Sequence, residues 1–211
     1  MPCSMLMKTP RKELYVRGLL SADRCDKIKQ EVLFMFEETE THTWPIDCFE
    51  IAKALNYLLI PYSLLSAPDM MAIDKDGFSK VVYNPWTGLY KYVIYYNDAQ
   101  PNEGRLRWTI FHEIGHIYLG HHDNPDDSLS EIEEAEADFF TKYAIAPPPL
   151  ISATNCSNMW DVQTTFNTST QAAEYIYDYY QKWLHFGPQR FLPFEIKMLE
   201  QFDAESGQLS G

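Results

Sequence analysis

The residues best suited to chemistry in this 211-residue chain are two histidines and a glutamate in its middle. His112, Glu113 and His116 form an H-E-x-x-H pattern, and the apolar run before it predicts a buried helix. Residues four apart lie above one another on one helix face, so His112 and His116 can direct two imidazoles at one ion. Glu113 lies beside that ion, where its carboxylate can accept a proton from water. The pattern therefore predicts a metal site, with Glu113 as the catalytic base.

A third ligand is expected from the acidic segment at residues 130–140. Catalytic zinc usually takes three protein ligands and keeps one position open, and two histidines with one glutamate are a known set. We predict that Glu134 binds the metal and that Asp138, one turn later, holds a ligand histidine by its free ring N–H. Such a run is ordinarily a solvated face, but alanines and phenylalanines interrupt this one. Glu136 stays an alternative ligand, because the sequence does not fix the rotation of the helix.

A competing pattern, H-E-x-x-H-x-x-G-x-x-H, would make His122 the third ligand. In that pattern a glycine breaks the helix at the position that Leu119 occupies here. This chain has its glycine one residue later, at Gly120, and leucine does not readily adopt a positive φ. We therefore expect Gly120 to be an ordinary helix C-cap, followed by a loop that carries His121 and His122 near the site.

The elements that must position these residues follow the order helix, strands, helices. Helices are predicted to begin after Ser21 (running to Glu38), after Asp47 and after Ser169, because each can act as an N-cap. The helix from Asp47 is expected to bury Phe49, Ile51, Ala52 and Leu55. Strand composition marks residues 57–65, 78–83 and 89–96, the last two joined as a hairpin by the turn at 84–88. Pro147 to Pro149 should end the acidic helix.

These elements predict an α+β fold. A small antiparallel or mixed sheet should pack against the H-E-x-x-H helix and the acidic helix, with helical N- and C-terminal extensions. The chain length favours one domain, residues 1–211. Within it we expect a helical N-terminal extension at 1–43, a core at 44–150, a helical C-terminal region at 151–205 and a disordered end at 206–211.

The composition indicates a protein of the cytoplasm that binds neither nucleic acid nor membrane. The net charge of −13 argues against a basic nucleic-acid surface and against attraction to anionic lipid. The sequence contains no apolar run of membrane-spanning length, and residues 1–12 lack the apolar core of a signal peptide. The scattered Cys3, Cys25, Cys48 and Cys156 are expected to be reduced thiols.

Over about residues 44–180, the chain resembles the ImmA/IrrE family of zinc metallopeptidases. Thr141 and Thr168 depart from the family pattern, but neither is a predicted ligand. The resemblance is carried by residues 45–55, 92–98, 107–116, 134–140, 145–147 and 166–173. It implies a zinc peptidase of the gluzincin type whose substrate is a regulatory protein, typically a helix-turn-helix repressor. Since this chain has no fused repressor domain, that substrate would be a separate protein.

Two other classes of function stay open. The first is a regulatory module that docks on a repressor without cleaving it, although that role would not need Glu113. The second is a zinc hydrolase acting on a non-peptide bond, because zinc and a base do not specify the bond that is broken. The residue that stabilises the reaction's oxyanion is also open. Its candidates are His121, His122, His185, Tyr118 and Tyr143.

Overall fold

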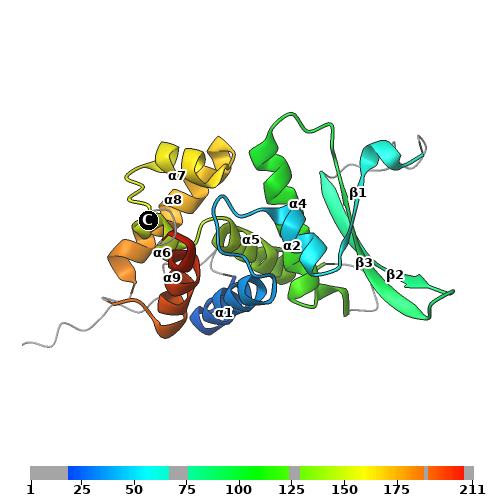
Figure 1. Ribbon diagram of the computed structural model, residues 1–211, viewed down its shortest axis with the longest axis horizontal. Coiled ribbons are helices and arrows are strands. Elements are labelled where there is room, and N and C mark those ends of the chain that lie inside the picture. The colour runs from blue at the N-terminus through cyan, green and yellow to red at the C-terminus, as the bar shows by residue number, and fades with distance from the viewer. Residues whose placement is uncertain (1–18, 67–75, 124–128, 188–189, 207–211) are drawn as a thin grey trace, which may run out of the picture.

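The computed structural model describes residues 19–66, 76–123, 129–187 and 190–206 (Figure 1). The predicted disordered end falls outside these ranges, apart from Ser206, which ends the last helix. In chain order the elements are α1 (Ala22–Glu38), α2 (Cys48–Ala54), β1 (Leu58–Pro61), η3 (Tyr62–Leu64), β2 (Gly77–Asn84), β3 (Leu89–Tyr96), α4 (Glu103–Tyr118), η4 (His121–Asp123), α5 (Glu131–Ile145), α6 (Pro148–Ala153), α7 (Met159–Phe166), α8 (Thr170–Phe186) and α9 (Pro193–Ser206). None of the helices in these ranges is long and apolar enough to cross a membrane.

The sheet is small and mixed, which confirms the predicted fold class. Its strand order is β1-β3-β2, with β1 parallel and β2 antiparallel to the central β3. The predicted hairpin joins β2 to β3, and Asn84 organises its turn by accepting hydrogen bonds from the N–H groups of Trp86 and Thr87. The first strand is shorter than the predicted 57–65. It ends at Pro61, and the chain continues into η3. There the carboxylate of Asp98 accepts a hydrogen bond from the N–H of Ser63.

The helix starts follow the predicted caps. The side chains of Ser21, Asp47 and Ser169 accept hydrogen bonds from backbone N–H groups at the starts of α1, α2 and α8. The predicted burial of α2 was partly wrong, because this short helix turns one face to the core. The helix buries Ile51, whereas the side chain of Phe49 is 36% exposed and makes a T-shaped contact with the ring of Tyr96.

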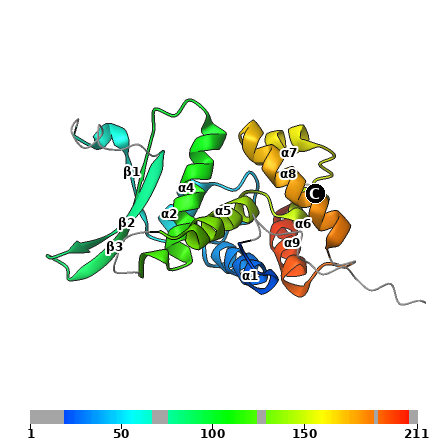
Figure 2. The same cartoon turned by 180° about the vertical axis from the view of Figure 1, so that it is seen from behind.

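Helix α4 lies between the sheet and the C-terminal helices (Figures 1 and 2), so its position fixes that of the site. It packs on β2 and β3, on α2 and on α5. The α4–α5 approach is close at Gly115, where an added Cβ would lie 3.0 Å from the ring of Phe140. The C-terminal helices α6 to α9 form the opposite end of the molecule from the sheet (Figures 1 and 2).

The proline run ends α5 as predicted, and it also starts the next helix. Helix α5 ends at Ile145 and α6 begins at Pro148, where a proline costs little because the first N–H groups of a helix have no intrahelical partner. Cys25, Cys48 and Cys156 are free and buried, as expected, whereas Cys3 lies outside the described residues.

Candidate metal centre

Helix α4 carries the H-E-x-x-H residues on a partly buried face. Asn102 caps the helix through the N–H of Arg105, and buried Ile110, Phe111, Ile114 and Ile117 anchor it in the core. His116 is fully enclosed, whereas the His112 side chain keeps some exposure to a cavity. The four-residue spacing places both imidazole Nε2 atoms on one side, 3.0 Å apart.

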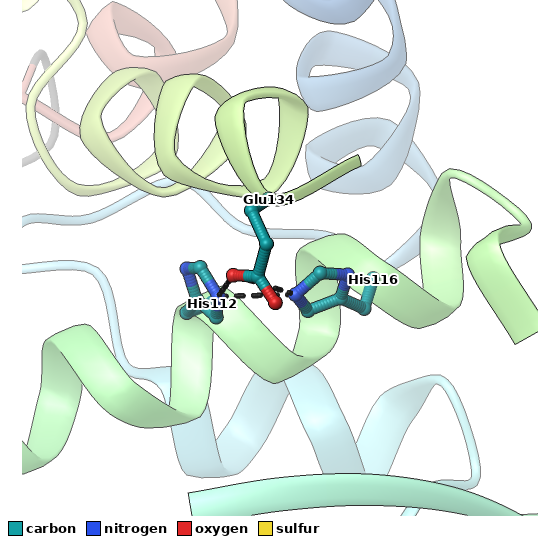
Figure 3. A group of neighbouring side chains, drawn as sticks. All are labelled: His112, His116 and Glu134. Carbon is teal, nitrogen blue, oxygen red and sulfur yellow. Dashed lines mark hydrogen bonds and ion pairs between the residues drawn. The ribbon is translucent and has the colours of Figure 1, made fainter. Parts of the chain in front are cut away.

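Helix α5 brings Glu134 over these two histidines. Ser130 and Glu133 form a capping box that fixes the first turn of α5, so Glu134 comes just after a well-defined helix start. Figure 3 shows its carboxylate reaching from α5 towards both imidazoles of α4. Glu134 Oε2 lies 3.2 Å from His112 Nε2 and 3.8 Å from His116 Nε2.

These three atoms fit a zinc ion. The ligand atoms all lie within 4.8 Å of one another, close enough for one metal ion to contact all three. Two imidazole nitrogens and one carboxylate oxygen are also a donor set that zinc accepts in catalytic sites. The structure thus assembles His112, His116 and Glu134 as a candidate metal site, in the combination that the sequence predicts.

The surrounding charges favour a cation at this point. Burial lowers the pKa of His112, but the interactions with the carboxylates of Asp138 and Glu134 and the charge of Glu113 outweigh it and raise the pKa to about 9. Hydrogen bonding to His112 and His116 holds the pKa of Glu134 well below its usual range. The anionic groups therefore stabilise positive charge among the two histidines, whether a proton or a metal ion supplies it.

Asp138 lies beside His112, as its predicted role of holding a ligand histidine by the free ring N–H requires. Its Oδ1 is 3.3 Å from His112 Nδ1, the ring nitrogen that faces away from Glu134. That Nδ1 is buried and makes no hydrogen bond of good geometry to any residue that the structure describes. A carboxylate at this distance suits an N–H that needs an acceptor, so the predicted role of Asp138 stays a prediction with supporting geometry.

Glu113, the predicted base, has a partner that sequence reasoning missed. Ser79 of β2 lies with its Oγ 2.6 Å from Glu113 Oε2, and the same Oγ is 2.9 Å from His122 Nε2. Ser79 is an ordinary strand residue in the sequence, and no local pattern marks it. The contact arises because β2 crosses α4 at this point.

A cavity of about 570 Å³ opens over these groups. It is lined by Asp76 and the start of β2, residues 77–80, and by residues of α4 and the first turns of α5. Trp108, Thr109, His112, Glu113, His116, His121, His122, Leu129, Glu134 and Asp138 complete the lining. Both the candidate metal site and Glu113 therefore face one solvent-accessible space of a size that admits a peptide segment.

Residues 64–176 match the family model of the IrrE N-terminal-like domain, peptidase family M78, which is more than half of the chain. The chain belongs to the M78 metallopeptidase family. The matched segment lies within the predicted range of about 44–180 and contains both candidate ligand helices, so the resemblance to ImmA/IrrE proteins is confirmed. A search of curated proteins found no match.

In this M78 peptidase, Glu136 is not part of the metal group. It is 8% exposed and faces Arg24 and His121, on the other side of α5 from the position of Glu134. Burial raises its pKa, but hydrogen bonds from Arg24 and His121 outweigh this and lower it. Glu136 therefore lies in a buried hydrogen-bonded group rather than on a solvated face.

The competing role of His122 as third ligand finds no support in the geometry. Gly120 has a φ of +76° after the last turn of α4, as expected for a residue just past a helix end. The chain then enters η4, and His122 reaches Ser79 rather than the group formed by His112 and His116.

The five candidates for oxyanion stabilisation separate by position. Tyr143 is fully buried, and His185 is exposed on α8. The hydroxyl of Tyr118 donates a hydrogen bond to Glu38. None of these three residues lines the cavity. His121 and His122 do line it. Since His121 is bonded to His116 and Glu136, His122 is the better placed of the two to face a substrate.

Proposed function

We propose that this M78 peptidase is a zinc-dependent endopeptidase that cuts a regulatory protein at a specific site, in the manner of a repressor-cleaving enzyme. The observation that carries the proposal is the triangle of His112, His116 and Glu134 next to Glu113, in one cavity of a chain from a peptidase family. His112, His116 and Glu134 would hold the zinc, with Asp138 orienting His112. A bound zinc ion would supply Lewis-acid chemistry, lowering the pKa of water and polarising the scissile carbonyl.

Glu113 is proposed to carry out the proton transfers of peptide hydrolysis. Its carboxylate accepts a proton from the attacking water and then donates it to the amine of the departing peptide. The hydrogen bond from Ser79 occupies Oε2, which fixes the carboxylate and leaves the other oxygen for these transfers. His122, whose Nε2 contacts Ser79, is proposed to donate a hydrogen bond from Nδ1 to the developing oxyanion when both of its ring nitrogens carry protons.

The peptide substrate is proposed to lie extended along β2. Within the described part of the sheet, β2 pairs with β3 on one side alone, and its first residues form a wall of the cavity. The open edge of a strand offers backbone N–H and C=O groups to a second extended chain. Such pairing would draw a peptide past Glu113 without requiring many side-chain contacts.

The substrate class follows from the family and from charge. A peptidase acts on protein, and the resemblance to ImmA/IrrE proteins favours a helix-turn-helix repressor as the proposed substrate. Net charge of −13 suits a basic DNA-binding protein as partner, encountered in the cytoplasm. The peptidase would then act on the repressor rather than on DNA.

The test co-expresses the chain with a candidate helix-turn-helix repressor from the same genome, under inducing conditions. Wild-type enzyme should convert the repressor to fragments, whereas Glu113→Gln should leave it full length. Glutamine keeps the size and hydrogen bonding of the side chain but cannot accept the proton, so zinc content should be unchanged. Equal derepression by both proteins, with the repressor intact, would refute the peptidase function and favour a docking role.

A further inference from the structure

The metal-ligand candidate His116 is the first member of a line of polar side chains that leads away from the cavity. Its Nε2 faces Glu134, and its other ring nitrogen, Nδ1, lies 2.9 Å from Nδ1 of His121. The second ring nitrogen of His121, Nε2, lies 3.1 Å from Glu136 Oε2. Glu136 in turn accepts hydrogen bonds from Arg24 through both of its oxygens, including Nε to Oε1 at 2.6 Å.

One assignment of protons satisfies every bond in this line. To offer a lone pair to a cation, His116 Nε2 must be bare, so its proton is on Nδ1 and is donated to His121 Nδ1. His121 then carries its own proton on Nε2 and donates it to the carboxylate of Glu136. Arg24 supplies two further N–H donors to that carboxylate. The charge at Glu136 therefore fixes the tautomer of His116 through His121.

The line is built from four separate elements. His116 is on α4, His121 on η4, Glu136 on α5 and Arg24 on α1. Gly120, with its φ of +76°, turns the chain after α4 so that His121 returns beside His116. The two histidines and Glu136 are buried, where an unfavourable tautomer could not be compensated by water.

We propose that His121, Glu136 and Arg24 are positioning residues that hold His116 in the ring orientation and tautomer needed to bind the metal. This inference rests on the proposed zinc site. It also assigns a role to α1, which precedes the segment matched by the family model and therefore supports the centre from outside the shared core. Arg24, with its side chain 35% exposed, is the part of the line nearest to solvent.

A purely structural explanation makes a different prediction. The Arg24–Glu136 pair also ties α1 to α5, which pack against each other. If the pair served only to hold α1 against α5, removing it would lower the stability of the protein equally with and without metal. A positioning role predicts a loss that appears specifically in metal affinity and in the spectrum of the bound metal.

The experiment measures zinc affinity of the full chain by competition with a chromogenic chelator, together with the visible absorption of the cobalt-substituted protein. Glu136→Gln should weaken zinc binding about 10–100-fold and shift the cobalt bands, because a neutral amide no longer orders the proton on His121. Arg24→Lys keeps the charge but loses the two-nitrogen fork, so it should give a smaller loss, about 3-fold. It also changes a partly exposed residue, which keeps the test valid if Glu136→Gln does not fold.

Two matched controls remove charge from the same helices outside this line. Glu131→Gln on α5 and Lys27→Gln on α1 change exposed residues and should leave zinc affinity and the cobalt spectrum unchanged. In the Glu136→Gln background, Arg24→Gln should add no further loss of zinc affinity, since the two act through one bond.

The outcomes separate this inference from the zinc site itself. A wild-type protein that binds no zinc would refute the proposed metal centre. Wild-type binding that Glu136→Gln and Arg24→Lys leave unaltered would refute the positioning role while keeping the zinc site. Equal losses of thermal stability in the zinc-free and zinc-loaded variants, with an unchanged cobalt spectrum, would show that the pair merely fastens α1.

Discussion

Ser79 Oγ on β2 lies 2.6 Å from Glu113 Oε2 on α4, which joins the edge of the sheet to the predicted catalytic base. The hydroxyl donates a hydrogen bond to the carboxylate and so orients the base. Because β2 is also the strand proposed to bind the substrate, this contact couples peptide docking to the position of Glu113.

Ser79→Ala should therefore lower kcat about 10-fold with little change in zinc content. A base that loses an orienting hydrogen bond keeps its chemistry but spends less time in the productive geometry. Cleavage kinetics on a peptide spanning the cut site would measure this. In the Glu113→Gln background, Ser79→Ala should not lower kcat further. A further loss of about 10-fold in kcat in that background would mean that Ser79 acts independently of Glu113.

The ligand set predicts about one zinc ion per chain. His112→Ala and His116→Ala should each abolish zinc binding, because each removes one of three donors. His122→Ala should retain zinc, since His122 faces Ser79. Metal analysis of the purified variants decides between these outcomes, and zinc loss in His122→Ala would restore the competing H-E-x-x-H-x-x-G-x-x-H arrangement.

Asp138→Asn should weaken zinc binding or activity about 10–100-fold, which is typical for the loss of a carboxylate behind a ligand histidine. The amide is neutral and accepts a hydrogen bond from His112 Nδ1 less strongly. Chelator competition gives the affinity, with Glu131→Gln as a control on the same helix. Unchanged affinity and activity would show that the 3.3 Å approach of Asp138 to His112 is incidental.

Gly115→Val should destabilise the protein by about 1–3 kcal/mol. The Cβ of any larger residue would lie 3.0 Å from Phe140 Cδ1, and a branched side chain adds more atoms to that contact between α4 and α5. Denaturant unfolding of the zinc-free protein measures the change. Phe140→Leu should partly rescue the variant, whereas identical losses with and without it would place the strain elsewhere.

Lys142→Met should make the protein more stable near neutral pH. Burial lowers the pKa of Lys142 to about 7, although the rings of Phe139, Tyr175 and Tyr179 surround its ammonium group. Because the unfolded-state pKa is near 10.4, the unfolded chain binds the proton more tightly, and stability rises as pH increases from about 7 to about 10.

The gain from Lys142→Met should accordingly be largest at and below pH 7, on the order of 1–3 kcal/mol, and should shrink towards pH 10. Unfolding free energies measured across this range would show it. A variant that is less stable than wild type at pH 7 would indicate that the cation–π contacts outweigh the cost of burial.

The sequence by itself determined those features that depend on the spacing of residues within one segment. His112 and His116 share a helix face because they are four residues apart, and Asn84 shapes its turn through neighbouring N–H groups. The caps at Ser21 and Ser169 likewise depend on atoms three residues away. Interactions of such short range are specified by the segment itself, wherever it lies in the fold.

The tertiary structure decided what depends on the packing of distant segments. The rotation of α5 selects Glu134 for the histidines and turns Glu136 towards Arg24, which is 112 positions earlier in the chain. The position of β2 over α4 brings Ser79 to Glu113. A helix pattern defines which residues share a face but not which neighbour that face meets, because this depends on how the whole core packs.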